Sequence, residues 1–129
     1  MKKTRRVHPK VRLAIYLQQF AELKQQIYEV QYFCKGTVLK RMMKCGQQRC
    51  VCHKDPTKRH GPYFEWTYKA NGKTVNLRLR PEEAAVYKTA TEQYRRLRSA
   101  LMRMETLSRK AVGVLAQQAH LEQAETNHL

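Results

Sequence analysis

The chain has 129 residues, with 26 Lys and Arg against 10 Asp and Glu, which gives a net charge of +16. This length excludes a large multi-domain enzyme, and 42% hydrophobic with 28% charged residues excludes a membrane protein and a fully disordered chain. The longest apolar run near the start, Leu13 to Leu17, is far shorter than the roughly 7–15 residues of a signal-peptide core. We therefore expect a cytoplasmic protein.

The positive charge is concentrated in two regions. Residues 1–12 carry six bases and no acid, and residues 35–60 carry eight bases against Asp55 alone. We predict a basic N-terminal arm at 1–12 and a single domain at 13–112, made of a helix, a metal-binding sheet and a long helix. Residues 113–129 are predicted to be a helical extension or a frayed tail.

The first predicted helix covers residues 9–34. This segment has no internal glycine or proline, and its apolar residues recur at three-, four- and five-residue steps. Pro9 suits a first-turn position and Gly36 suits the stop. Cys34 lies on the apolar stripe, where we expect a small core residue.

Three strands are predicted next. Residues 37–43 are β-branched and apolar, and two runs of alternating residues follow at 63–69 and from residue 73 to 80. Asn71-Gly72 lies between the two runs, and this pair favours a tight hairpin turn. The apolar face is predicted to be covered by a helix; its residues are Phe64, Trp66, Tyr68, Val75, Leu77 and Leu79.

A second long helix is predicted from Pro81, which is followed by acids that suit a helix start. Apolar residues continue at alternating steps of three and four, and this coiled-coil-like period favours lengthwise packing on the helix at 9–34. The seam is Tyr94, Leu97, Leu101 and Met104. Gly113 is a point where this helix is predicted to end or bend. The expected fold class is α+β, with two long antiparallel helices packed on a small three-stranded antiparallel sheet that carries a zinc knuckle.

The cysteine cluster lies between the first two predicted strands. Three thiols at Cys45, Cys50 and Cys52, with His60 eight residues further on, supply the Cys₃His set of a tetrahedral zinc site. A loop whose only hydrophobic residue is Val51 cannot order itself by burial, whereas a bound ion contributes its binding free energy to folding. We therefore predict Zn²⁺ as the cofactor.

Other interpretations of this cluster stay open on the sequence alone. His53 is an alternative ligand in place of His60 or of Cys52, which it follows directly. The thiols are also compatible with reduced cysteines on an unstructured basic loop, or with a redox-sensing pair.

The combined pattern resembles a family of small, uncharacterised bacterial proteins. The resemblance covers about residues 36–108 and is carried by Cys45-Gly46, Cys50-x-Cys52, His60-Gly61-Pro62-Tyr63, Trp66, Gly72-Lys73 and the helix around Tyr94-Arg95-Arg96-Leu97. It implies a metal-binding domain of unknown function from bacterial and mobile-element contexts, and it assigns no catalytic residue.

The basic charge indicates a nucleic-acid partner, either DNA or RNA. Lysines and arginines around a rigid metal loop suit phosphate contacts, and Tyr63 suits stacking on an unpaired base or packing beside Pro62. The predicted contact residues are Arg5, Arg6, Arg41, Lys44, Arg49, Lys54, Lys58, Arg59, Tyr63, Arg78 and Arg80.

The sequence thus favours an accessory or architectural nucleic-acid-binding protein over an enzyme. There is no carboxylate cluster and no phosphate-binding glycine loop, and four protein ligands leave zinc no open position for chemistry. The alternative is an interaction subunit whose helix at 82–112 forms a homodimer or docks on a recombinase or nuclease.

Overall fold

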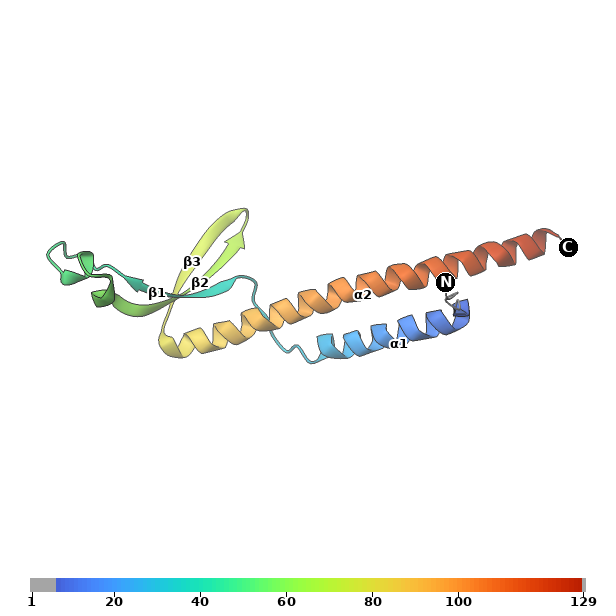
Figure 1. Cartoon of the computed structure of the whole chain (residues 1–129), viewed down its shortest axis with the longest axis horizontal. Coiled ribbons are helices and arrows are strands. Elements are labelled where there is room, and N and C mark those ends of the chain that lie inside the picture. Colours follow the sequence, from blue (N-terminus) through green and yellow to red (C-terminus); the bar gives the residue numbers. More distant parts are fainter. Residues whose placement is uncertain (1–6, 129) are drawn as a thin grey trace, which may run out of the picture. The chain divides into compact units, whose positions relative to one another are not determined.

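The computed structural model describes residues 7–128, so the predicted contacts of Arg5 and Arg6 lie outside the described residues. The elements in order are α1 (Pro9–Tyr28), β1 (Thr37–Met43), two 3₁₀ turns (Val51–His53 and Pro56–Lys58), β2 (His60–Ala70), β3 (Lys73–Leu79) and α2 (Pro81–Asn127) (Figure 1). This α+β arrangement of two helices and a three-stranded antiparallel sheet confirms the predicted class.

The contacts divide the chain into two compact units. One unit contains residues 7–30 and 96–128, which are α1 and the later part of α2. The other is Gln31–Arg95, which holds the sheet, the cysteine loop and the first turns of α2. The division into an arm, one domain and an extension stays a prediction.

The sheet has the order β1-β2-β3, and both pairs of strands are antiparallel. Asn71 and Gly72 both have positive φ, at 51° and 77°, as the predicted hairpin turn requires. The register pairs Phe64 with Leu79 and Trp66 with Leu77. Since paired residues share a face of a sheet, these apolar side chains lie on one side, as predicted.

Aromatic side chains organise this apolar face. Trp66 stacks on Tyr68 with ring centres 4.0 Å apart and meets Tyr87 of α2 at 5.0 Å. Its Nε1–H donates to the Lys35 carbonyl at 2.8 Å. Tyr87 in the first turns of α2 and the Lys35 carbonyl before β1 thus contact Trp66 on this face, so a helix provides part of the predicted cover, while Leu77 on the same face is 44% exposed.

The predicted helix at 9–34 is too long. It ends at Tyr28, and the Cys34 N–H donates to the carbonyl of Ala90 in α2 at 3.1 Å. Phe33 stacks on Tyr94, with ring centres 5.7 Å apart. The apolar residues after Tyr28 thus lie in an irregular segment that contacts α2. Periodicity alone predicted helical hydrogen bonds here, but contacts with α2 replace them.

Gly36 has a different role from the predicted helix stop. Its φ is +108°, and a Cβ at this position would collide with the Thr67 carbonyl oxygen and lie 2.9 Å from Trp66 Nε1. The absent side chain lets the entry to β1 approach β2 closely.

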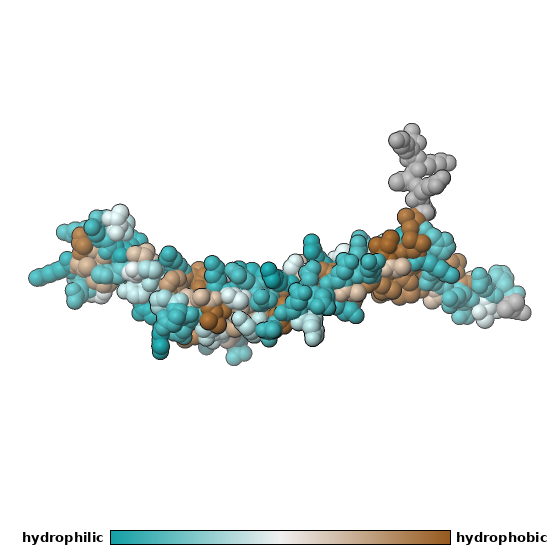
Figure 2. Space-filling view, turned by 90° about the horizontal axis from the view of Figure 1, so that it is seen from below, coloured by the Kyte–Doolittle hydropathy of each residue, from teal (hydrophilic) through white to brown (hydrophobic). Residues whose placement is uncertain are grey.

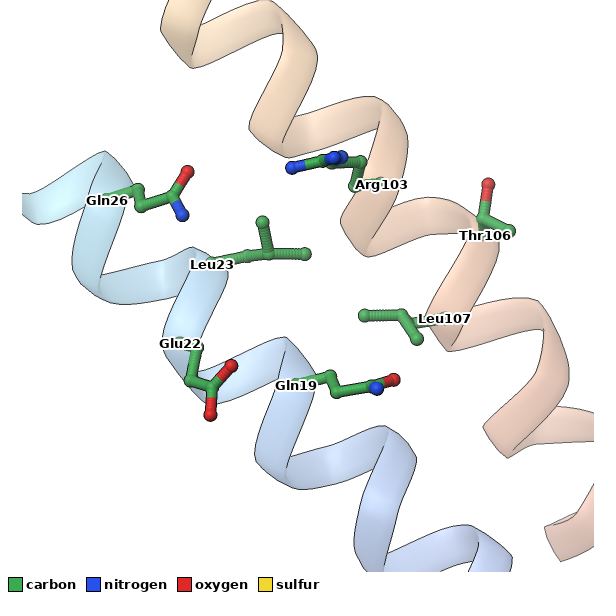
Figure 3. A pocket seen from close by; sticks show the side chains of 7 residues that line it. All are labelled: Gln19, Glu22, Leu23, Gln26, Arg103, Thr106 and Leu107. Atoms are coloured by element: carbon green, nitrogen blue, oxygen red, sulfur yellow. The ribbon is translucent and has the colours of Figure 1, made fainter.

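The helical unit pairs α1 with the later part of α2 in opposite directions. The Lys110 amine lies 5.9 Å from the Tyr16 ring centre, while Leu23 and Leu107 point toward one another further along α1 (Figure 3). They line an open cavity of about 450 Å³ together with Gln19, Glu22, Gln26, Arg103 and Thr106. This pairing thus leaves part of the space between the helices unfilled.

Two details of α2 differ from the prediction. The helix does not end at Gly113, since it runs through to Asn127. Of the predicted seam, Leu101 is 52% exposed, and the buried residues of this part are Ala100, Ala111 and Val114. The fully buried positions of this part thus carry Ala and Val, while the seam residues Tyr94, Leu97 and Met104 are half-buried.

Candidate metal centre

The ends of β1 and β2 bring the first and last candidate ligands together. Met43 pairs with His60, so Cys45 follows β1 close to the point where His60 opens β2. The register shifts between Arg41 and Met43, which marks a bulge where the two strands diverge into the loop.

Two short turns position the other two thiols. The Cys50 N–H donates to the Gln47 carbonyl, and the 3₁₀ turn Val51–His53 begins directly after Cys50. Such a turn provides the tight reversal that a Cys-x-Cys pair needs to direct both sulfur atoms to one point. Cys52 is 1% exposed, so its thiol is buried within the loop.

The four candidate ligands converge. One ligand atom from each of Cys45, Cys50, Cys52 and His60 lies within 4.8 Å of all the others. Cys45 Sγ and Cys52 Sγ are 3.6 Å apart, and Cys50 Sγ lies 3.3 Å from His60 Nε2. With Zn–S near 2.3 Å and Zn–N near 2.0–2.1 Å, a tetrahedron has edges of about 3.8 Å between sulfurs and about 3.6 Å between sulfur and nitrogen. The group therefore suits a metal ion such as zinc.

Hydrogen bonds give the thiols different proton affinities. The pKa of Cys50 is lowered to about 6, first by the backbone N–H of Cys52 and then by the His60 imidazole. Burial raises the pKa of Cys52, although the Cys45 N–H donates to its sulfur at 3.3 Å and opposes that rise. Cys50 is thus the thiol best prepared to act as a thiolate ligand.

His53 has a supporting position. Its Nε2 lies 2.8 Å from the Cys45 carbonyl oxygen, within hydrogen-bond distance, and it does not belong to the converging group. The geometry favours His60 over His53 as the fourth ligand. His53 instead holds the backbone of a ligand, a supporting role that the sequence did not reveal beyond its position next to Cys52.

Most of the predicted phosphate-contacting side chains are exposed around this centre. Among the described residues, no ion pair involves Lys44, Arg49, Lys54 or Lys58. Arg80, in contrast, lies 3.4 Å from the Glu83 carboxylate at the start of α2. Arg59 is only half-buried, yet its Nε is buried without a hydrogen-bond partner in the described part of the chain.

The remaining candidates lie on the other face of the sheet from Trp66. Arg41 Nε lies 3.8 Å from a Glu65 carboxylate oxygen, and the Arg78 guanidinium lies 4.2 Å from the centre of the Tyr63 ring. Both arginines and Tyr63 were predicted to contact nucleic acid, whereas the ion pair of Glu65 with Arg41 was not predicted. The signal for Glu65 was its position in the alternating run beside Tyr63.

No helix within residues 7–128 is both long and apolar enough to cross a membrane. No curated protein and no solved structure matches the chain. A family match covers the first helix, the cysteine loop, the sheet and the start of α2, and so begins and ends earlier than the resemblance predicted at 36–108. Residues 13–89 match the family described as Domain of unknown function (DUF6788), and the chain belongs to this family.

Proposed function

We propose that this chain is a zinc-stabilised nucleic-acid-binding accessory protein whose metal-binding loop contacts phosphates. The observation that carries the proposal is the placement of Lys44, Arg49, Lys54 and Lys58, four exposed cations without ion pairs within residues 7–128, around a converging Cys₃His group. Three thiolates and an imidazole favour zinc over the harder cations, which prefer oxygen ligands.

The proposed role of the metal is structural. With four protein ligands a tetrahedral zinc ion has no open position, so it supplies folding free energy to the loop rather than a reactive water. The loop offers little hydrophobic burial of its own, since Val51 is 55% exposed. A rigid loop holds its lysines and arginines at fixed positions, which lowers the entropic cost of meeting a phosphate backbone.

The charge distribution supports a polyanionic partner for the same unit. Residues 31–95 carry 14 Lys and Arg against five Asp and Glu, whereas residues 7–30 and 96–128 carry eight against five. The excess is therefore concentrated on the unit that holds the metal group. Cations that neutralise phosphates release counterions, so affinity falls steeply with salt.

The test is a salt series of nucleic-acid binding. The full chain loaded with zinc is titrated with DNA and RNA, single-stranded and duplex, at several salt concentrations. Lys44, Arg49 and Lys58 are replaced together by Gln, and the matched control replaces Lys24, Arg96 and Arg98, which are also exposed but lie on the helical unit. Zinc content and circular dichroism check that every variant folds.

The proposal expects binding that weakens steeply with salt. The loop variant is expected to reduce the slope of log affinity against log salt by about 2 to 3, and the control variant by much less. Equal losses in the two variants, or an absence of binding at low salt, would contradict the proposed function.

A second candidate function is protein interaction through the helical unit. Val11 and Ile15 of α1 are 50% and 44% exposed, and Val112 and Leu115 of α2 are 59% and 48% exposed. Figure 2 shows hydrophobic residues gathered on the surface near the start of α1. Exposed apolar patches of this kind are typical of interaction surfaces. Light scattering on the full chain tests this function. If the chain self-associates through these exposed residues, its measured mass exceeds that of one chain, and Ile15→Ser with Val112→Ser lowers it toward that of one chain.

A further inference from the structure

The face of the sheet opposite Trp66 carries an ordered group of polar and charged side chains. Register places Arg41 across from Tyr63 and Glu65 across from Arg78, so these four side chains share that face. The face continues toward the hairpin with Thr67–Asn76 and Lys69–Thr74 hydrogen bonds of 2.8 and 2.7 Å. Within residues 7–128, the aromatic contacts with α2 are all made on the opposite face or before β1.

The centre of this group is a stack of a guanidinium on a phenol ring. Arg78 Cζ lies 4.2 Å from the centre of the Tyr63 ring, which is the spacing of a cation–π contact. Tyr63 is half-buried and Arg78 is exposed. The guanidinium thus lies over the ring, and its side away from the ring is open to a flat partner because the side chain is exposed.

Glu65 fixes the surroundings of the stack. Its side chain is only 22% exposed and lies 3.8 Å from Arg41 Nε. It lies between Tyr63 and Thr67 on β2 and opposite Arg78 on β3. The Glu65 carboxylate thus pairs with Arg41, and two cations against one anion leave the face positive.

We propose that Arg78, supported by Tyr63, forms a stacking site for one unpaired base of a single-stranded nucleic acid; this inference rests on the proposed function. Arginine planes and aromatic rings bind unpaired bases by stacking, whereas a base within a duplex already has both faces occupied by its neighbours. Tyr63 follows His60 by only three residues in β2, at most about 10 Å along the chain. A strand that places its base on Arg78 thus has phosphates near the cations of the metal loop.

The test uses a single-stranded oligonucleotide of about 12 nucleotides that contains a fluorescent adenine analogue, prepared as DNA and as RNA, together with the matching duplexes. The protein is the full zinc-loaded chain. The variants are Arg78→Lys, which keeps the charge but loses the plane, Tyr63→Phe, which keeps the ring, and Tyr63→Ala. Lys73→Ala is the matched control, because it removes an exposed cation from β3 outside the stack. Zinc content verifies the folding of each variant.

The single strand is expected to bind more tightly than the duplex at equal salt and to lose fluorescence as the base stacks. Arg78→Lys and Tyr63→Ala should remove this quenching and weaken single-strand binding about 5- to 150-fold, the range found for one stacked base. Tyr63→Phe and Lys73→Ala should keep the quenching. Preference for single-stranded RNA or for single-stranded DNA identifies which strand the site takes, and either preference supports the inference.

Two other outcomes separate the inference from the proposed function. If the duplex binds as tightly as the single strand, or if Arg78→Lys and Tyr63→Ala quench as the unaltered chain does, the stacking site is wrong and the phosphate-binding loop stands. If none of the nucleic acids binds at low salt, the proposed function fails and the inference fails with it.

Discussion

The two histidines near the thiols, His53 and His60, contact different atoms. His60 Nε2 lies 3.3 Å from Cys50 Sγ, as a fourth ligand should, while His53 Nε2 lies 2.8 Å from the Cys45 carbonyl oxygen. A ligand supplies a bond to the metal, whereas a supporting group only orients a ligand.

Substitution of the two histidines by Ala should therefore give unequal losses. His60→Ala is expected to remove a ligand and to abolish stoichiometric zinc binding in competition with a chelator. His53→Ala should keep one zinc per chain and weaken the affinity by about 10- to 100-fold, the effect typical of a supporting contact. The reverse order of the two variants would make His53 the fourth ligand.

A second prediction at this scale concerns Gly36. Ala at this position needs an unfavourable φ of +108° and places a Cβ against the Thr67 carbonyl oxygen. We expect Gly36→Ala to lower the free energy of unfolding by at least about 2 kcal/mol in urea titrations. Gly46→Ala is the control, since nothing lies within 4 Å of its added Cβ, and it should change stability by less than about 0.5 kcal/mol. Equal effects would show that the close approach of the chain at Gly36 is not needed.

At the scale of elements, the sequence predicted what depends on local rules. The hairpin follows from Asn71-Gly72 and from two alternating runs, because turn type and strand alternation are properties of neighbouring residues. The candidate ligands were also predicted from local sequence, because three thiols and an imidazole at this spacing are typical of a metal site.

The end of α1 was missed because it depends on a distant partner. Residues 30–34 continue an apolar period, but the Cys34 N–H finds its acceptor at Ala90, more than 50 residues later in the chain. The contacts of Glu65 and His53 were not predicted for a similar reason: Glu65 pairs with Arg41 on a neighbouring strand, and His53 lies against a backbone carbonyl eight residues earlier. No window of local sequence contains such contacts.

Gly113 gives a prediction for α2. It lies inside a continuous helix, and nothing lies within 4 Å of an added Cβ. Gly113→Ala should raise the free energy of unfolding by about 1 kcal/mol, because glycine in a helix interior loses more backbone entropy on folding. Chemical denaturation followed by far-UV circular dichroism measures this change. A loss of stability would contradict the open surroundings of Gly113 within a continuous helix.

At the scale of the whole molecule, the proposed metal ion and apolar burial would stabilise different units. The buried residues of the helical unit are Leu23, Ala100, Ala111 and Val114, whereas the cysteine group belongs to the other unit. The loop of residues 44–60 has only Cys52 buried. Its order thus depends on the ion in this account, while the helices depend on one another.

Removal of the metal should therefore act locally. With a chelator present, amide hydrogen exchange is expected to accelerate in residues 44–60, while the helical signal in far-UV circular dichroism changes little. Restored zinc should reverse the effect. Exchange that accelerates equally in α1 would show that the metal supports the helical unit as well.

The most direct measurement of the central claim is the metal content of the purified chain, determined by elemental analysis and by native mass spectrometry. The account predicts one zinc ion per chain, and it predicts that Cys50→Ser and Cys52→Ser each lose the ion while Cys34→Ser retains it. A chain that is free of metal, yet protects residues 44–60 from hydrogen exchange and binds nucleic acid with full affinity, would contradict the account.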